Sequence, residues 1–379
     1  MFRLSIWYKA ARRGFRGFQP PASQAFKPIM EYTGKYTAMK RRLPAEWEDQ
    51  DGVLIAWPHG EGDWKPYLHQ VEPVFAEMAL QISRYERVLV AASDPVAVQM
   101  ELMKIRAEMD NITFVKCETN DTWTRDYGPI TVFDNGRPVL LDFGFNGWGL
   151  KFASERDNLV TRRLHASGVF GTTPLLTHSF ILEGGSIESD GQGTILTTSE
   201  CLLGPNRNPH LNKKQIEDSL AVHFGADHFL WLNHGYLAGD DTDSHVDTLA
   251  RLCPWDTILH VGCDDPHDEH FGSIRAMTEE LRSFRTRHGG RYRLVPLPWP
   301  SPKYDQDGQR LPATYANFLI INEAVLVPTY RDKSDEAALE IIRGVFQERT
   351  VIGVDCSPLI LQHGSMHCVT MQIPKGVLA

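Results

Sequence analysis

The chain has 379 residues, a formal net charge of -9 at pH 7 and six cysteines, none of them at CxxC spacing. An acidic balance of this size disfavours nucleic acid as a partner and suits a cationic ligand. No stretch approaches the roughly 20 apolar residues of a membrane span. We therefore expect a protein with free thiols in the reducing cytoplasm and no membrane association.

The first 42 residues have the opposite charge balance, with ten lysines and arginines opposed by Glu31 alone. Such a start resembles a transit peptide. The alternative is that translation begins later, at Met30 or Met39. Both interpretations predict a poorly ordered basic extension over 1–42. Because no linker or low-complexity tract follows, we expect one catalytic domain over 43–376.

Along the rest of the chain, helical spacing of apolar residues alternates with short β-rich runs. The predicted helices begin 59, 59, 57 and 64 residues apart. They cover 95–109, 154–166, 213–224, 270–285 and 334–346. The predicted strands cover 53–57, 87–93, 112–117, 138–143, 193–199, 228–232, 257–262, 318–328 and 350–355. A unit of strands and one helix that recurs about five times indicates a closed or stacked repeat architecture, although a doubly wound sheet also alternates strands and helices.

Four chemically reactive residues follow the same interval. Asp126 and Glu183 are 57 positions apart, Glu183 and His245 are 62 apart, and His245 and Cys368 are 123 apart, about twice 61. Two carboxylates, an imidazole and a thiol form a plausible nucleophilic site. Such groups can meet only if distant units share one axis, which favours closure of the repeat.

Each of these residues lies in a short motif: WTRDYGP at 123–129, LEGGS at 182–186, HVD at 245–247 and HC at 367–368. On an extended segment His245 and Asp247 point to the same side. Each motif alone is compatible with an ordinary polar loop. Taken together, and with the NRNP turn at 206–209, they resemble the motifs of the agmatine deiminase and bacterial peptidyl-arginine deiminase family.

The resemblance runs from the LPAEWE segment at Leu43 to Cys368 and implies the fold of that family. This fold is a closed five-bladed α/β propeller, or pentein, with its active site on the central axis. The similarity is strongest to the agmatine branch, which shares the LPAEWE opening, the FNGWG run at 145–149 and the NRNP turn. One departure is the 362–365 segment, Gln-His-Gly-Ser, where many agmatine deiminases have several glycines and an asparagine.

The resemblance also implies a role for each residue of the site. Cys368 is expected to be the nucleophile, His245 the general acid/base and Glu183 the carboxylate that orients His245. Asp126 and Asp247 are expected to bind the guanidinium. This chemistry requires neither a metal nor another cofactor.

The expected partner is a small cationic guanidino substrate, and a homo-oligomer is possible. Trp123 and Trp57 are candidates for contacting the aliphatic stem of the substrate. Its far end is expected near residues 309–312, Tyr315 and Asn317.

The predicted reaction is hydrolytic deimination of agmatine to N-carbamoylputrescine and ammonia through a covalent cysteine thiouronium. Peptidyl or free arginine is the alternative substrate, and it would need a cation such as Arg125 or Arg310 for its carboxylate. An amidinotransferase would use the same cysteine. A metal-dependent hydrolase with His245, Asp247, His367 and Cys368 as ligands, or a non-catalytic repeat scaffold, are the remaining alternatives.

Overall fold

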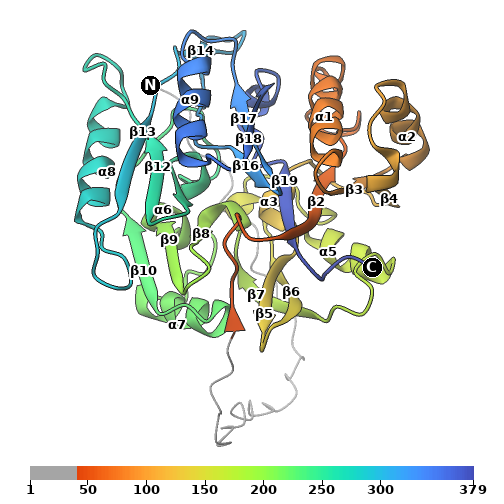
Figure 1. Cartoon of the computed structure of the whole chain (residues 1–379), viewed down its shortest axis with the longest axis horizontal. Coiled ribbons are helices and arrows are strands. Elements are labelled where there is room, and N and C mark those ends of the chain that lie inside the picture. The colour runs from red at the N-terminus through yellow and green to blue at the C-terminus, as the bar shows by residue number, and fades with distance from the viewer. Residues whose placement is uncertain (1–40) are drawn as a thin grey trace, which may run out of the picture. The chain divides into compact units, whose positions relative to one another are not determined.

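The computed structural model describes residues 41–379 (Figure 1), so nearly all of the predicted basic extension over 1–42 lies outside the described residues. Arg41 and Arg42 form strand β1 (Arg41–Arg42), which pairs antiparallel with β5 (Ile130–Asp134). The first described residues therefore already belong to a sheet.

The described chain is a mixed α/β protein whose strands form five sheets of three or four strands and one two-stranded ribbon. The sheets are, in hydrogen-bonded order, β19 (Thr370–Pro374), β2 (Gln50–Ala56), β3 (Arg87–Ala92), β4 (Ile112–Lys116); β1, β5, β6 (Arg137–Gly144), β7 (Leu175–Ile181); β10 (His228–Leu232), β9 (Thr194–Thr198), β8 (Ile187–Ser189); β11 (Ala250–Cys253), β12 (Thr257–Val261), β13 (Arg293–Leu297); and β16 (Leu319–Ile321), β17 (Ala324–Thr329), β18 (Thr350–Asp355). The ribbon pairs β14 (Lys303–Tyr304) with β15 (Arg310–Leu311).

All five sheets repeat one pairing pattern, an antiparallel strand pair followed by a parallel neighbour. A helix connects each pair of parallel strands, as a parallel connection requires. These helices are α1 (Leu68–Ser83), α2 (Pro95–Lys104), α5 (Val160–Ala166), α7 (Lys213–Phe224), α8 (Phe271–Ser283) and α9 (Asp335–Val345). The repeated unit of strands and a helix is therefore confirmed.

The first sheet draws on both ends of the described chain, because C-terminal β19 pairs with β2. Figure 1 shows α2, α7 and α8 at the periphery of this view, whereas the one-turn helix α3 (Thr124–Tyr127) and β19 lie near its middle. None of the helices in residues 41–379 is both long and apolar enough to cross a bilayer.

Local signals account for the predicted helices. Asp94 caps α2 by accepting from the backbone N–H of Ala97, and α7 begins with a capping box between Asn212 and Gln215. Gly225 ends α7 in the left-handed conformation. The helix predicted over 154–166 begins later, at Val160, after a 3₁₀ turn.

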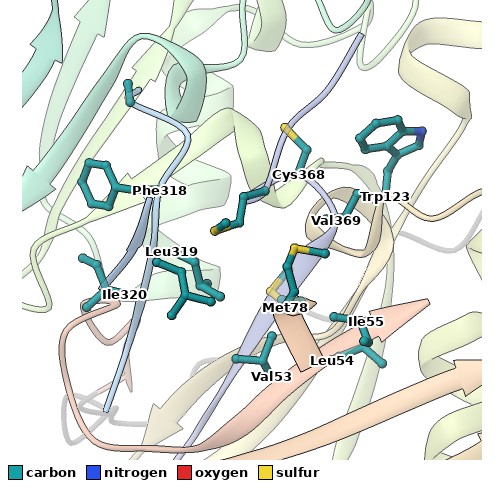
Figure 2. Close-up of a cluster of buried hydrophobic side chains, with 14 of the residues drawn as sticks. Val53, Leu54, Ile55, Met78, Trp123, Phe318, Leu319, Ile320, Cys368 and Val369 are labelled. Carbon is teal, nitrogen blue, oxygen red and sulfur yellow. The ribbon is translucent and has the colours of Figure 1, made fainter. Parts of the chain in front are cut away.

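Helix α1 was not predicted. It contains Pro73, which normally interrupts a helix. The structure offsets this by burying one side of the helix, including Phe75 and Met78. Figure 2 shows Met78 packed beside Val53, Leu54 and Ile55 of β2. The residues of β2 from Gly52 to Ala56 are all buried, as expected for a sheet covered on both faces.

Candidate active site

Cys368 lies just before β19, where segments distant in the sequence hold its backbone. The side-chain oxygen of Asn317 accepts the backbone N–H groups of His367 (2.9 Å) and Cys368 (3.3 Å), and lies 3.4 Å from the cysteine sulfur. The carbonyl of Cys368 accepts from the backbone of Arg125. Figure 2 shows the thiol at the edge of the apolar cluster, next to Trp123.

His245 lies between two carboxylates. Its Nδ1 is 3.4 Å from Asp126 Oδ1 and its Nε2 is 3.4 Å from Glu183 Oε2, with all three residues buried. Burial alone would lower the pKa of His245, but Asp126, Cys201 and Glu183 outweigh it and raise the pKa well above the ordinary value. The two carboxylates therefore favour the protonated imidazole, which is the form that can act as an acid.

Gly185, the second glycine of the LEGGS motif, lies where a side chain would not fit. A Cβ at this position would lie 2.7 Å from His245 Nδ1, 2.8 Å from Asp126 Oδ1 and 3.2 Å from Asp247 Oδ2. Any side chain there would displace the groups that converge on it. The same residue donates its N–H to Asp126 (3.0 Å). Asp126, His245 and Asp247 thus meet around one backbone position.

Glu183 is fixed by Arg207 of the NRNP turn, whose Nε lies 2.9 and 3.1 Å from the two carboxylate oxygens. The thiol of Cys201 is 3.4 Å from the same carboxylate. Burial would raise the pKa of Glu183, but His245 and Arg207 lower it below its usual range. Glu183 is therefore an anion that can orient His245.

Asp126 uses both oxygens within the protein, because its second oxygen accepts the indole N–H of Trp148 at 2.8 Å. Burial raises the pKa of Asp126 to about 6, with Asp247 and Glu183 adding to the rise and His245 opposing it.

Asp247 differs from Asp126 in having one free oxygen. Its Oδ2 contacts His367 Nδ1 at 2.7 Å and Asn317 Nδ2 at 3.3 Å, and lies 3.9 Å from the sulfur of Cys368. Its Oδ1 is buried and has no hydrogen-bond partner within residues 41–379. An unsatisfied buried carboxylate oxygen is unfavourable, and a bound N–H donor would satisfy it.

A cavity of about 150 Å³ opens onto Cys368, Asp126 and Trp123. His245, Glu183 and Asp247 are buried behind this lining. In the described part of the chain, the cavity lining contains no lysine or arginine. Its other members are Asp63, Asp121, Trp148, Phe152, Asp240, Asp241, Thr242, Thr248, Gln362, His363 and Gly364. The lining is therefore acidic and aromatic, which suits an elongated cation.

The 362–365 segment, which differs from the sequence of many agmatine deiminases, forms part of the cavity lining. Gly364 packs against the ring of Trp123 so closely that a Cβ would lie 2.1 Å from a ring carbon. Gln362 and His363 line the cavity. This loop therefore shapes the space beyond the thiol.

Trp57 does not line the cavity. It packs edge-on against Phe75 at a centroid distance of 6.0 Å. The structure therefore does not support the predicted contact of Trp57 with substrate, because the preceding strand directs this ring into the core. Trp123, by contrast, lines the cavity, and its contact with the substrate stem stays a prediction.

The cations considered for a substrate carboxylate also lie elsewhere. Arg125 is buried against Gln372 and the His367 carbonyl, and Arg310 pairs with Asp268 and Glu269. Neither lines the cavity.

Residues 309–312 and Tyr315, predicted near the far end of the substrate, do not line the cavity. The β14–β15 ribbon lengthens this period and carries Arg310 away, and the Tyr315 hydroxyl bonds Asp335. Asn317 does lie beside Cys368, with its side-chain oxygen 3.4 Å from the sulfur.

The predicted metal ligands do not form a set within residues 41–379. The groups close enough to share an ion are Glu183 with Cys201 and His245, and Glu46 with Glu188 and His367. In each group an arginine already bonds the carboxylates: Arg207 in the first and Arg251 in the second. A metal would have to displace a buried cation, so these donors fit ion pairs better than a metal centre.

The family model of Porphyromonas-type peptidyl-arginine deiminases matches residues 42–374. The chain belongs to this family. Agmatine deiminase from Pseudomonas aeruginosa is 35% identical over 356 residues, covering 88% of this chain and 95% of the relative. The protein is accordingly a hydrolase acting on guanidino C–N bonds.

Solved structures of deiminases are also similar to this chain over most of its length. A cysteine-to-serine variant of C. jejuni agmatine deiminase with substrate bound is 41% identical, with a TM-score of 0.83 over 90% of this chain and 98% of the other. A Porphyromonas gingivalis structure, provisionally described as an arginine deiminase, is 48% identical, with a TM-score of 0.86 over 90% and 100%.

Several residues of the site were not assigned a role from sequence. Arg207, Trp148 and Glu46 lie in the NRNP, FNGWG and LPAEWE motifs, which were noted only as family features. Cys201 was treated as an ordinary buried thiol. A role could have been predicted for Arg207, Trp148 and Glu46, because a polar or aromatic residue in a motif shared with a family is expected to contact other residues of the site.

Proposed function

We propose that this protein hydrolyses agmatine to N-carbamoylputrescine and ammonia, with Cys368 as the nucleophile. The observation that carries the proposal is an acidic cavity lined by the thiol of Cys368, with the half-satisfied carboxylate of Asp247 buried behind that lining, 3.9 Å from the sulfur. Agmatine is positively charged at both ends, and the lining offers carboxylates and no arginine or lysine among the described residues. The substrate-bound C. jejuni relative supports this choice.

The guanidinium would bind through Asp247 and Asp126. The free Oδ1 of Asp247 can accept one N–H, and the carboxylate of Asp126 can accept from another edge of the same planar group. This arrangement would bring the central carbon of the guanidinium next to the sulfur of Cys368, because Asp247 Oδ2 lies 3.9 Å from that sulfur. Two anions against one cation also repay the desolvation of the guanidinium.

Cys368 would attack as a thiolate and form a C–S bond, giving a tetrahedral adduct. His245 would protonate one nitrogen, which leaves as ammonia when the C–N bond breaks. The remaining S-alkylthiouronium would be attacked by water that His245 deprotonates, and collapse would release the ureido product and the thiolate. One water is consumed and one ammonia is released in each cycle.

The substrate would also help to form the nucleophile. Burial raises the pKa of Cys368 well above its ordinary value, and Asp247 and Asp126 raise it further. A guanidinium bound between those carboxylates would cancel their field and lower the thiol pKa. Titration of thiolate absorbance with and without an unreactive guanidinium analogue tests this step. An unchanged thiol pKa would contradict it.

The ammonium end of agmatine would face Asp241 and Asp63. Both line the cavity. Within residues 41–379 the Asp241 carboxylate has one ion-pair partner, His363 at 4.0 Å, while Lys151 donates to the Asp241 backbone carbonyl. Arginine carries a carboxylate at this end, which would meet acidic groups. The acidic lining therefore favours agmatine over free or peptidyl arginine.

A parallel assay of ureido product from agmatine, free arginine and a peptide with C-terminal arginine tests the substrate. We expect agmatine to be preferred. Turnover of arginine alone, as the P. gingivalis structure's description would suggest, would overturn this choice and leave the chemistry standing. Product formed only when a second amine is added would instead identify an amidinotransferase.

We also infer that the five sheets close into a ring around this site. The shared pairing pattern and the β19–β2 pairing of distant chain segments support that inference. A cytoplasmic location and a homo-oligomer stay predictions, and sedimentation of the purified protein tests the second.

A further inference from the structure

A second buried imidazole, that of His367, lies directly behind the proposed site. Its Nδ1 is 2.7 Å from Asp247 Oδ2, and its Nε2 is 2.7 Å from Glu46 Oε2. All three side chains are buried. His367 therefore joins the two carboxylates, with one ring nitrogen in short contact with each.

Glu46 belongs to the LPAEWE motif, to which the proposed mechanism gives no role. Its other oxygen accepts the backbone N–H of Ile320 at 2.8 Å, so the carboxylate is fixed to β16. Arg251 donates to Glu46 at 2.9 Å and to Glu188 at 2.6 Å. Arg251 also lies 3.0 Å from His367 Nε2.

These contacts fix the orientation of the Asp247 carboxylate. Its Oδ2 is held by His367 and by Asn317, so rotation of the carboxylate is blocked. The free Oδ1 is the only Asp247 oxygen without a partner within residues 41–379. Fixing one oxygen determines where the other can point.

We propose that Glu46 and His367 are positioning residues that orient Asp247 toward the guanidinium of the substrate. This inference rests on the proposed function, because it assigns Asp247 to substrate binding. Glu46 acts through His367, and His367 acts through Asp247. Neither touches the substrate.

Two amide substitutions of His367 separate its two contacts. The Asn side-chain N–H₂ falls near the position of His Nδ1, so His367→Asn keeps a donor to Asp247. The Gln N–H₂ falls near Nε2, so His367→Gln keeps a donor to Glu46 and loses the one to Asp247. Both variants replace the ring with a neutral amide. A merely structural role would affect them in parallel.

The experiment measures KM, kcat and thermal midpoint for the full-length enzyme and both variants. We expect His367→Gln to raise KM for agmatine at least about tenfold, because a hydrogen bond to a charged group is lost. His367→Asn should stay within about threefold of wild type at a similar thermal midpoint. Equal KM values for the two variants would overturn the proposal.

Glu46→Gln and Glu188→Gln provide a matched pair that does not alter His367. Both carboxylates bind Arg251, but only Glu46 contacts His367. Glu46→Gln should raise KM more than Glu188→Gln, even if both lower the thermal midpoint equally. The reverse order would contradict the proposal.

This design separates failure of the inference from failure of the proposed function. If wild-type enzyme turns over arginine rather than agmatine, the proposed substrate is wrong. The four variants are then compared on arginine, where the same KM order is expected because its guanidinium is identical. If wild type turns over agmatine and the KM order is absent, only the positioning role is wrong.

Discussion

The molecule contains two buried imidazoles, each between two carboxylates, and the two differ in how tightly they are held. His245 lies 3.4 Å from both Asp126 and Glu183, whereas His367 lies 2.7 Å from both Asp247 and Glu46. A proton in the first site has long, weak contacts and can be transferred. The second ring is held in place by two short contacts, one at each nitrogen. We propose that similar local groups serve proton transfer at His245 and positioning at His367.

The strongest test of this contrast is removal of the transferable proton. His245→Gln should lower kcat about 1,000-fold, the usual range for loss of a general acid and base. Binding of agmatine should be retained, because Asp126 and Asp247 remain. Stopped-flow or steady-state assays of kcat, with calorimetric binding, provide the measurement. A comparable loss of kcat in His367→Asn would erase the proposed difference between the two histidines.

The next largest effect is expected from crowding the junction at Gly185. Gly185→Ala places a methyl group 2.7 Å from His245 Nδ1 and 2.8 Å from Asp126. Since displacement by about 1 Å can cost a hundredfold in rate, kcat/KM should fall by about that factor. The matched control is Gly272→Ala on α8, where nothing lies within 4 Å of the added carbon. Full activity in the Gly185 variant would show that the convergence is not required.

A pH profile tests the charge state of the loosely held site. The pKa of Asp126 is raised to about 6. Below that value Asp126 becomes neutral and loses its attraction for the guanidinium, so kcat/KM should fall as pH decreases through about 6. His245 should keep its proton above its ordinary range, because its pKa is raised. An acid limb near the ordinary aspartate value would contradict this environment.

The smallest effect is expected at the cavity mouth. Asp241→Asn should raise KM for agmatine by about threefold, because a partly exposed ion pair is weak. Asp110→Asn removes the same charge from a surface site outside the cavity lining and controls for net charge. If both substitutions raise KM equally, bulk charge rather than Asp241 attracts the ammonium end.

Local sequence signals predicted much of the fold. The helix over 213–224 was found at its bounds, because its cap at Asn212 and its C-terminal Gly225 are sequence-local features. Helix α1 was missed because Pro73 is read as a break, and its stability comes from burial against other elements. Ring closure could be inferred only indirectly, because strand pairing such as β19 with β2 depends on distant residues.

The proposed site shows the same division. Motifs located Asp126, His245 and Cys368, and the structure joins their neighbourhoods around Gly185 and Asp247. The contact between Glu46 and His367 joins residues 321 positions apart, so no local sequence pattern could predict it. Trp57 was misassigned because sequence does not state which way a ring at a strand end will point.

The central claim is that Cys368 attacks a guanidinium carbon held by Asp247 and Asp126. The most direct test is mass spectrometry of enzyme quenched with acid during turnover of agmatine. The account predicts an added mass equal to agmatine less ammonia, mapped to the peptide that contains Cys368 and absent from Cys368→Ser. Turnover by Cys368→Ser, or an adduct on another cysteine, would contradict it.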